Sequence, residues 1–435
     1  MDIRVFPGKI NGTVQANASK SVMQRACAAA LLHKGVSVIS NPGNSNDDTA
    51  ALGIIERLGA KITPLEGNRI RIESPGFPQP VNAPEITEVD CGESGLSIRM
   101  FSPIAALSAY PVRMTGGGSL SSRPLGQVAD MLKPLGVRVE TKNGKLPIEI
   151  QGPLKSKQLI LDGSLSSQFL TGLLMAFAGL ENGETEIKVT NLTSRPYIDL
   201  TLDVLRSFGL AVPANRAYEN FLFPAKSQKQ VGMVHYEVEA DWSGAAFLLV
   251  AGAIGGQITV NGLKLDSFQG DKKILEALHT AGANIEITGN AISVEKNQLK
   301  GFHFDATDCP DLFPPLVALA AQCDGQSVIS GVKRLKHKES DRGQTLKEEF
   351  EKTGCRILPD GDQMTITPSQ TTVSKEMVFH SHHDHRIAMA VALSIAASGH
   401  SGVILHADAI KKSYPGFFAH LQQLGIQSAI LNETL

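Results

Sequence analysis

The chain alternates between long alanine-rich runs and short segments with the pattern of strands. The run from Ser19 to Leu32 has good helix formers and neither glycine nor proline, so it predicts a helix. Ser19 suits the N-cap because its hydroxyl can accept a hydrogen bond from an orphan backbone N–H. Lys20, Ser21 and Arg25 then fall in the first turns. Since a helix start already carries positive dipole charge, these residues predict an anion site there, although a solvated basic turn is the alternative.

A second pattern recurs six times along the chain: a helix ends in a glycine and leads into a strand. Glycine suits this position because it adopts the left-handed conformation that closes many helices. The glycines follow one another at steps of 71 to 77 residues, and alanine-rich helices begin at nearly the same step. The glycines are Gly59, Gly136, Gly209, Gly282, Gly354 and Gly425, and the alanine-rich helices begin near Lys20, Glu93, Ser166, Asp241, Asp311 and Asp384.

Each period reads as a small β-α-β-α-β-β unit. A short strand precedes the alanine-rich helix, a strand such as Gly35–Ile39 follows it, and the glycine-closed helix leads into two more strands. We therefore predict an α/β fold with six such units in two similar halves. The break between the halves should fall near Glu237–Asp241, where the fourth alanine-rich helix begins.

Composition narrows the function classes. The 435 residues carry a formal net charge of −2, which argues against a general nucleic-acid or membrane-surface binder. No uninterrupted apolar run of about 18 residues is present, so no membrane span is expected. The five cysteines are scattered and form no C-x-x-C pair, and the first residues have no apolar signal segment. We expect a protein of the cytoplasm with reduced cysteines.

Polar residues gather where the predicted helices begin. Most are Lys, Arg, Ser and Gln, the hydrogen-bond donors that hold carboxylates and phosphates. If these helix starts face one cleft, it would suit two small polyanionic substrates, and the few acids there, notably Asp311 and Glu339, would be candidates for proton transfer. Besides Lys20, Ser21 and Arg25, the segments are Gly92–Gly95 with Arg99, Ser122–Pro124, Ser166–Gln168, Ser194–Tyr197, Cys309–Asp311, Lys338–Arg342, His383–Arg386 and Lys411–Pro415.

Several of these segments also have simpler interpretations. The run Lys336–Arg342 could be a solvated charged surface, and Ser166–Gln168 could only cap a helix. Asp311 could likewise be an N-cap and nothing more.

The histidines and cysteines raise a question of metal binding or reactivity. His380–His385 could be a metal cluster, but His382 and His383 point to different sides in any regular element, and we expect no metal site. Cys91 and Cys309 flank helix starts, where a thiol can be activated, but packing as small hydrophobic residues is the expected role.

Together, these motifs resemble the 3-phosphoshikimate 1-carboxyvinyltransferases, the EPSP synthase family of the shikimate pathway. The resemblance runs over the whole chain, in order and at the family's spacing. It implies one domain over residues 18–236 and a second over residues 1–17 and 237–435, joined by a two-stranded hinge. The matching motifs are Ser19–Ser21 with Arg25, Ser122–Leu125, Ser166–Thr171, Ser194–Asp199, Pro310–Asp311, Lys338–Arg342, Asp384–Met389 and Lys412–Pro415.

The resemblance also implies a reaction. The enolpyruvyl group of phosphoenolpyruvate passes to the 5-hydroxyl of shikimate 3-phosphate by addition and elimination, with release of phosphate. It implies no metal or organic cofactor, no nucleic-acid or membrane partner, and we expect a monomer. Asp311 would take the hydroxyl proton, and Glu339 with Lys20 would deliver a proton to the methylene carbon.

The same resemblance implies two sets of substrate-binding residues. Shikimate 3-phosphate would be held by Lys20, Ser21, Arg25, Ser166, Ser167, Gln168, Ser194, Tyr197, Asp311 and Lys338. Phosphoenolpyruvate would be held by Lys20, Gly95, Arg123, Gln168, Arg342, Arg386 and Lys412.

The chain departs from the family at two places. Where the family often reads G-N-A-G-T-A-M-R, Gly92–Arg99 has Glu93, an acid beside the expected phosphate of phosphoenolpyruvate, and Arg334 replaces a common Asn. Glu93 motivates one alternative, a relative that binds anions without turnover. Another is the related enolpyruvyl transferase acting on UDP-N-acetylglucosamine, which carries a cysteine before the Arg-Pro dipeptide. Gly116–Ser122 has none.

Overall fold

The chain folds into two compact units, seen here in a computed structural model that describes residues 1–78, 86–155, 158–164, 166–180, 184–225, 232–369 and 376–431. Unit 1 comprises Met1–Asn17 and Ala240–Leu435, and unit 2 comprises Ala18–Glu239. The division after Glu239 lies within the Glu237–Asp241 stretch named from the repeats, and the family resemblance implied a boundary after Tyr236. Among the described residues, no helix is both long enough and apolar enough to cross a membrane.

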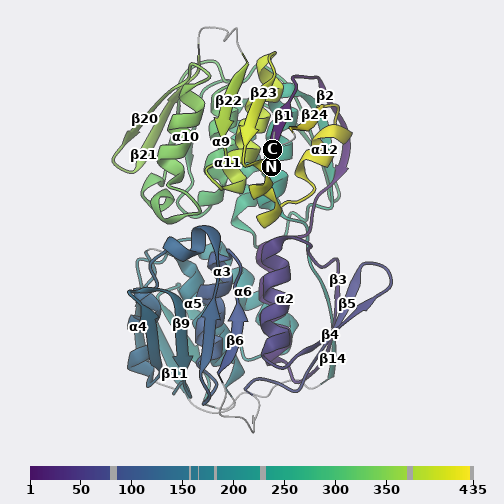
Figure 1. The fold of residues 1–435 in the computed structure, drawn as a ribbon. Helices are drawn as coiled ribbons and strands as arrows, with labels where there is room; N and C mark the ends of the chain where they lie inside the picture. Colours follow the sequence, from purple (N-terminus) through teal and green to yellow (C-terminus); the bar gives the residue numbers. More distant parts are fainter. Residues whose placement is uncertain are drawn as a thin grey trace. The chain divides into compact units, whose positions relative to one another are not determined.

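The described strands form six four-stranded sheets, three in each unit (Figure 1). In unit 2 the orders are β14 (Gly232–Glu237)-β3 (Gly35–Ser40)-β5 (Arg69–Ser74)-β4 (Lys61–Leu65), β6 (Thr87–Asp90)-β7 (Val112–Thr115)-β9 (Lys145–Gln151)-β8 (Arg138–Lys142), and β10 (Gln158–Asp162)-β11 (Thr185–Thr190)-β13 (Asn220–Phe223)-β12 (Ala214–Arg216). In unit 1 they are β16 (Asn284–Thr288)-β17 (Ala291–Glu295)-β15 (Gly256–Asn261)-β2 (Ile10–Gln15), β18 (His303–Asp305)-β19 (Ser327–Ser330)-β21 (Gln363–Thr367)-β20 (Arg356–Asp360), and β22 (Met377–His380)-β23 (Gly402–Leu405)-β1 (Asp2–Val5)-β24 (Ser428–Leu431).

Two series of helices alternate with these strands. The alanine-rich series is α1 (Lys20–Leu32), α3 (Gly95–Ala105), α5 (Ser167–Gly179), α7 (Trp242–Gly255), α9 (Phe313–Ala320) and α11 (His385–Ser398). The glycine-closed series is α2 (Asn46–Arg57), α4 (Gly126–Leu132), α6 (Arg195–Ser207), α8 (Ile274–Ala281), α10 (Arg342–Glu351) and α12 (Phe417–Gln423). The predicted α/β fold of six βαβαββ units in two similar halves is confirmed.

Each unit has its own hydrophobic core, centred on its alanine-rich helices. In unit 1, α7, α9 and α11 contact one another, and in unit 2, α3 packs against α5 and α1. Alanine suits these central helices because its small side chain lets neighbouring helices approach closely. The six predicted closing glycines all have positive φ, from 62° at Gly209 to 107° at Gly59, as the left-handed helix ending requires.

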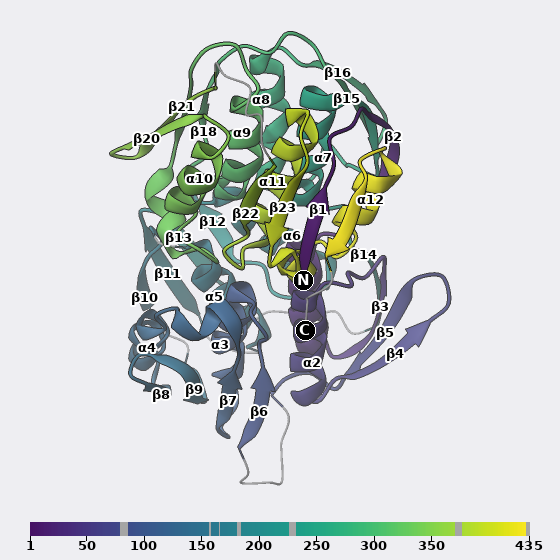
Figure 2. The same cartoon turned by 45° about the horizontal axis from the view of Figure 1, so that its top comes forward.

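Each of three strands, β1, β2 and β14, completes a sheet whose other strands come from a distant part of the sequence. β2 pairs in parallel with β15, and β1 lies between β23 and β24, so the N-terminal strands complete two sheets of unit 1 (Figure 2). In unit 2, β14 pairs in parallel with β3 of the first repeat. The first repeat therefore takes its leading strand from β14, and the sixth repeat has only one described strand after its last helix.

Candidate active site

Arg342, the first residue of α10, is the centre of a charged network in unit 1. Only 1% of its side chain is exposed. Its guanidinium donates to three carboxylates, with Nε at 2.7 Å from Asp384 Oδ2, Nη1 at 2.7 Å from Asp311 Oδ1 and Nη2 at 2.6 Å from Glu339 Oε2. Burial alone would lower the pKa of Arg342, but the attraction of these carboxylates outweighs it and raises the pKa.

Three positively charged side chains form ion pairs with Asp311. It lies in a short 3-10 helix, η4 (Pro310–Leu312), just before α9. Besides Arg342, Lys338 Nζ lies 3.2 Å from Oδ1 and Arg386 Nη2 lies 3.2 Å from Oδ2. Burial alone would raise the pKa of Asp311, but Arg386, Lys338 and Arg342 together hold it well below its usual range. Asp311 is therefore a carboxylate at neutral pH, and it is not the N-cap of α9, which is Leu312.

Asp384 holds two helix starts together. As the N-cap of α11 it accepts a hydrogen bond from the backbone N–H of Arg386, with 3.0 Å between nitrogen and Oδ1. The same carboxylate receives Arg342 and the hydroxyl of Ser340, the latter at 3.1 Å from Oδ2. A carboxylate suits a helix N-terminus because the dipole there is positive. Asp384 thus links Arg342 to the start of the helix that carries Arg386. Arg342 and Arg386 are the two arginines of this unit that the family resemblance assigned to phosphoenolpyruvate.

The other predicted residues of unit 1 lie in the segments beside this network. Lys338 and Glu339 follow the 3-10 helix η5 (Val332–His337), and Lys412 ends η6 (Ala407–Lys412), where its side chain is buried. Burial lowers the pKa of Lys338, and Asp311 offsets only part of that effect. The segment that the sequence also allowed as a solvated charged run therefore includes buried, hydrogen-bonded groups.

A second acid in unit 1 has its pKa shifted in the opposite direction from that of Asp311. Asp271 is fully buried, accepts a hydrogen bond from the hydroxyl of Ser243, and has its pKa raised to about 6. The main cause is burial, with a further contribution from the charge of Asp311. Sequence reasoning did not identify Asp271, because it lies in the 3-10 helix Gly270–Lys273 without any neighbouring motif.

In unit 2, Lys20 and Arg25 lie on α1 as predicted but have different partners. Lys20 Nζ forms an ion pair with Asp47 Oδ2 at 2.9 Å, and both side chains are largely buried. Arg25 donates from Nε to the hydroxyl of Thr201 at 3.0 Å and from Nη1 to the carbonyl of Ser21 at 2.7 Å. Burial lowers the pKa of Arg25 to about 10. The predicted Ser19 cap makes no side-chain capping bond.

Gly95, the first residue of α3, lies directly under two arginine side chains. A Cβ at this glycine would overlap Arg123 Nη1 and lie 2.9 Å from Arg99 Nη1. Arg99 Nη1 in turn donates to Gln168 Oε1 at 2.9 Å. The structure thus brings together the predicted Gly95, Arg123 and Gln168, and it adds Arg99, which the sequence analysis noted but did not assign.

Four predicted residues with hydroxyl groups lie at the starts of α5 and α6. Ser166 caps α5 by accepting from the backbone N–H of Gln168, at 3.2 Å, and Ser167 is the first residue of that helix. Ser194 precedes α6 with a φ of 56°, and its carbonyl accepts from the backbone N–H of Tyr197 at 3.1 Å. The Tyr197 carbonyl also accepts from Arg25 Nη2, at 3.4 Å. This contact links α6 to α1.

Glu93 is held by the loop that precedes Arg123. Its Oε2 accepts from the backbone N–H of Ser119 at 3.1 Å, and its carboxylate occupies the space beside Gly118. A Cβ at Gly118 would overlap the carboxylate of Glu93, so only glycine fits there without displacing the acid. Glu93 therefore replaces the neutral residue expected at this place with a carboxylate fixed by a backbone N–H.

The cysteines and histidines are placed as follows. The five cysteines are unpaired and buried, and burial strongly raises the pKa of the Cys91 and Cys309 thiols, in keeping with packing roles. Among the histidines, His380, His383 and His406 lie close together in unit 1. His406 lies outside the His380–His385 run, so the sequence pattern did not include it.

Comparison with known proteins identifies relatives over nearly the whole chain. The family model described as EPSP synthase (3-phosphoshikimate 1-carboxyvinyltransferase) matches residues 6–421. The 3-phosphoshikimate 1-carboxyvinyltransferase of Clostridium beijerinckii is 33% identical over 428 residues, 98% of this chain and 97% of the relative. That of Clostridium perfringens is 36% identical over 422 residues, covering 97% of each chain.

Solved structures share the fold over the same extent. The structure of EPSP synthase from Acinetobacter baumannii matches with a TM-score of 0.79 and 26% identity, covering 99% of this chain and 100% of that one. An enolpyruvyl transferase from Streptomyces tendae matches with a TM-score of 0.77 and 98% coverage of both chains. At 15% identity, this second likeness concerns the fold alone.

Proposed function

The chain belongs to the EPSP synthase family and transfers the enolpyruvyl group of phosphoenolpyruvate to shikimate 3-phosphate, and we propose that the charged groups described above carry this reaction. The observation that supports this assignment best is the network around Arg342. It places an ionised carboxylate, Asp311, beside a second acid, Glu339, among three fixed cations. Such an arrangement suits both proton transfer and the binding of anionic substrates.

Asp311 is the proposed acceptor of the proton from the 5-hydroxyl of shikimate 3-phosphate. A general base must be unprotonated at the working pH, and the lowered pKa of Asp311 meets this requirement. The same lowered pKa makes it a weak base. The negative groups of bound phosphoenolpyruvate would interact with Arg342 and Arg386, and these arginines would then stabilise the Asp311 carboxylate less. We therefore expect phosphoenolpyruvate binding to raise the proton affinity of Asp311.

Glu339, with Lys20, is the proposed donor of a proton to the methylene carbon of phosphoenolpyruvate. As that carbon gains the proton, C2 becomes electrophilic and bonds to the hydroxyl oxygen, which gives a tetrahedral intermediate. Loss of a proton from the new methyl group and departure of phosphate then restore the carbon–carbon double bond. Charge moves on the phosphate and carboxylate during both steps, and fixed cations stabilise it because they need no reorganisation.

The remaining residues are proposed binding groups. For shikimate 3-phosphate we assign Ser21, Arg25, Ser166, Ser167, Gln168, Ser194, Tyr197 and Lys338 in addition to Lys20 and Asp311. For phosphoenolpyruvate we assign Gly95, Arg123, Gln168, Arg342, Arg386 and Lys412 in addition to Lys20. Arg99 joins Gly95 to Gln168, and Arg123 lies against Gly95. These contacts support treating Gly95, Arg123 and Gln168 as one binding group.

The assay that tests this proposal is phosphate release from phosphoenolpyruvate in the presence of shikimate 3-phosphate. We expect Asp311→Ala to lower kcat at least about 100-fold while the protein stays folded. Asp360→Ala, which removes an exposed acid from β20, is the matched control and should keep the normal rate. Near-normal turnover of Asp311→Ala would remove Asp311 from its proposed role.

The sequence alone also allowed a relative that binds both substrates without turnover, and the family assignment speaks against it. Glu93 is the feature that raises this alternative, because the acid lies two residues before Gly95, which is assigned to phosphoenolpyruvate. Phosphate release by the unmodified protein excludes this candidate. Normal binding of both substrates without release would establish it.

We also propose that the protein acts in the cytoplasm as a monomer and that its reaction needs no metal or organic cofactor. The buried, unpaired cysteines support a reducing compartment. Acid–base and electrostatic groups suffice for every step proposed above. Light scattering at assay concentration and turnover in the presence of a chelator test the last two points.

A further inference from the structure

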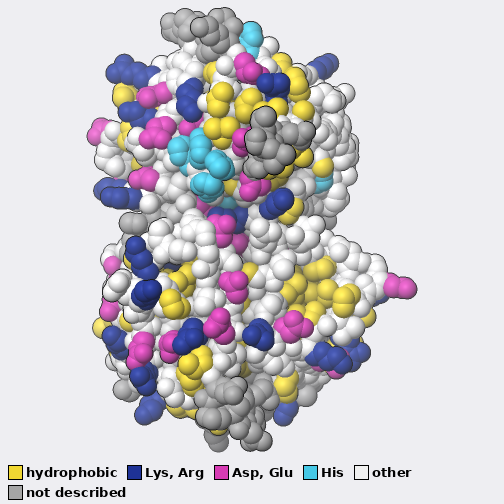
Figure 3. All heavy atoms as spheres, in the orientation of Figure 1, with side chains coloured by type: hydrophobic (Ala, Val, Ile, Leu, Met, Phe, Trp, Pro, Cys, Tyr) yellow, Lys and Arg dark blue, Asp and Glu magenta, His cyan; other side chains and the backbone are white. Residues whose placement is uncertain are grey.

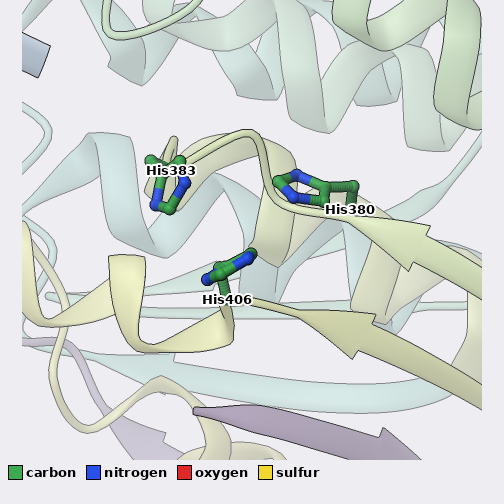
Figure 4. A group of neighbouring side chains, drawn as sticks. All are labelled: His380, His383 and His406. Carbon is green, nitrogen blue, oxygen red and sulfur yellow. The ribbon is translucent and has the colours of Figure 1, made fainter.

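Three histidines of unit 1 come together where two neighbouring strands end. β22 ends at His380, and β23 is followed directly by His406, while His383 lies in the loop between β22 and α11. Because β22 and β23 are parallel and paired, with His380 opposite Leu405, their carboxyl ends lie at the same edge of the sheet. Figure 4 shows the three rings directed towards one another from these segments.

The spacing of the rings suits one ion. The ring centroids lie 4.5 Å apart for His383 and His406, 4.9 Å for His380 and His406, and 5.8 Å for His380 and His383. One nitrogen of each ring lies within 4.8 Å of the others. Three nitrogens at about 2.0 Å from a tetrahedral metal would be about 3.3 Å apart, so modest side-chain rotations close the difference.

The backbone of both loops is fixed by hydrogen bonds. The hydroxyl of Ser381 donates to the carbonyl of His406 at 2.8 Å and accepts from the backbone N–H of His383 at 3.1 Å. The backbone N–H of His406 donates to Asp2 Oδ1 at 2.8 Å. The positions of His383 and His406 are therefore set by their main chains, which lowers the entropy lost when their rings bind an ion.

His380 must exchange one interaction for another. Its Nδ1 accepts from the backbone N–H of His382 at 2.7 Å. Coordination through Nδ1 uses that lone pair, and coordination through Nε2 requires a proton on Nδ1, so either route gives up this hydrogen bond. A coordinate bond to a transition metal is stronger than a hydrogen bond, whose net contribution is about 1 kcal/mol.

We propose that His380, His383 and His406 bind a divalent transition-metal ion such as Zn²⁺, with water as the fourth ligand. Neutral imidazoles are ligands that Zn²⁺, Cu²⁺ and Ni²⁺ prefer, whereas Mg²⁺ and Ca²⁺ prefer oxygen. His383 and His406 are exposed, and histidine side chains gather in one surface patch in Figure 3, so an ion has access from solvent. This site is independent of the proposed chemistry, which uses none of the three rings.

A bound ion would connect the loop before α11 to the loop before η6. These segments lead into Arg386 and Lys412, both assigned above to phosphoenolpyruvate. An ion that binds the folded state alone stabilises it by mass action. We therefore expect Zn²⁺ to raise the midpoint of urea unfolding of unit 1, followed by the fluorescence of Trp242, the single tryptophan of the chain.

The test is calorimetric titration of the full chain with Zn²⁺ in metal-free buffer. We expect one high-affinity site per chain and, in the double variant His383→Ala/His406→Ala, a loss of at least about 10-fold in affinity. His279→Ala, which removes an exposed histidine of α8, is the matched control and should bind as the unmodified chain does. Absence of binding, or equal affinity of the double variant and the control, would overturn the proposal.

A second measurement keeps the proposal testable if the double variant does not fold. Co²⁺ added to the unmodified chain should give the strong visible absorption of a tetrahedral site, and an equimolar amount of Zn²⁺ should remove it. Weak absorption typical of six-coordinate cobalt would contradict the site as described.

Discussion

Two buried arginines, one in each unit, have opposite electrostatic surroundings. In unit 1, Arg342 donates to Asp384, Asp311 and Glu339, and these carboxylates raise its pKa. In unit 2, the hydrogen bonds described for Arg25 go to hydroxyls and backbone carbonyls, and burial lowers its pKa to about 10. The difference shows two ways of keeping an arginine inside a protein.

The two surroundings suggest different tasks. The charge of Arg342 is compensated within the protein, so Arg342 fixes the positions of Asp311 and Asp384 and, together with Arg386 and Lys338, holds the pKa of Asp311 low. The charge of Arg25 is held by neutral dipoles, which orient the guanidinium without cancelling its field. Arg25 is thus suited to attract the phosphate of a substrate, whereas Arg342 organises an acid–base network.

Replacing the compensated arginine should have the largest effect. Arg342→Met leaves the fully buried carboxylate of Asp384 without its main partner, and we expect it to destabilise unit 1 by about 3–5 kcal/mol. Urea unfolding followed by Trp242 fluorescence measures this, because Trp242 lies in unit 1. Arg25→Met is the matched control in unit 2 and should leave the Trp242 transition unchanged. An unchanged midpoint in Arg342→Met would contradict the argument.

A smaller change tests the acid beside Arg342. Glu339→Gln keeps an acceptor for Arg342 but cannot deliver a proton, so we expect kcat to fall at least about 100-fold with the fold preserved. Phosphate release at saturating substrate concentrations measures the loss. Glu348→Gln, on the exposed side of α10, should keep its activity. A rate for Glu339→Gln within a few-fold of normal would exclude Glu339 as the proton donor.

The raised pKa of Asp271 predicts a pH effect on the stability of unit 1. Its pKa is about 6 in the folded protein, against an ordinary value of 3.8, so its contribution to stability is greatest below pH 4 and is lost as pH rises through 6. Relative to Asp271→Asn, the unmodified chain should lose about 2 kcal/mol of unfolding free energy between pH 4 and pH 6. Urea unfolding followed by Trp242 fluorescence gives the unfolding free energy of the unmodified chain and of Asp271→Asn at each pH. Parallel pH curves for the two proteins would refute the prediction.

The smallest expected effect concerns Gly95. In Gly95→Ala the new methyl group displaces Arg123 and Arg99, so we expect the KM for phosphoenolpyruvate to rise about 10-fold, equivalent to about 1.4 kcal/mol. The KM for shikimate 3-phosphate should change less. Gly53→Ala, where a Cβ meets no atom within 4 Å, is the control and should not alter either value. Equal changes in both KM values would indicate a general disturbance of α3.

The sequence predicted the repeats because each rests on local chemistry. The closing glycines end helices in the left-handed conformation, which their place in the sequence predicts. The alanine-rich helices can be recognised from their composition. The completion of sheets by β1, β2 and β14 was only partly predictable. A strand's partner depends on which distant edge is left open, and no local residue pattern specifies that edge.

The candidate site was predictable where residues belong to motifs. Asp311, Lys338, Glu339 and Arg342 come together in the structure as the motifs implied. Asp271 and Asp47 were missed because each is defined by a partner far along the chain, Ser243 and Lys20 respectively. His406 was missed for the same reason, since only the pairing of β22 with β23 brings it to His380.

The two N-terminal strands have a consequence for synthesis on the ribosome. β1 and β2 emerge first, but β2 pairs with β15, which begins at Gly256, and β1 pairs with β23, which begins at Gly402. All of unit 2 is therefore translated while these strands still lack their partners. Since domains generally fold as units during synthesis, unit 2 should fold early. β2 must avoid other exposed sheet edges until the fourth repeat has left the ribosome, and β1 must do so until the last repeat has.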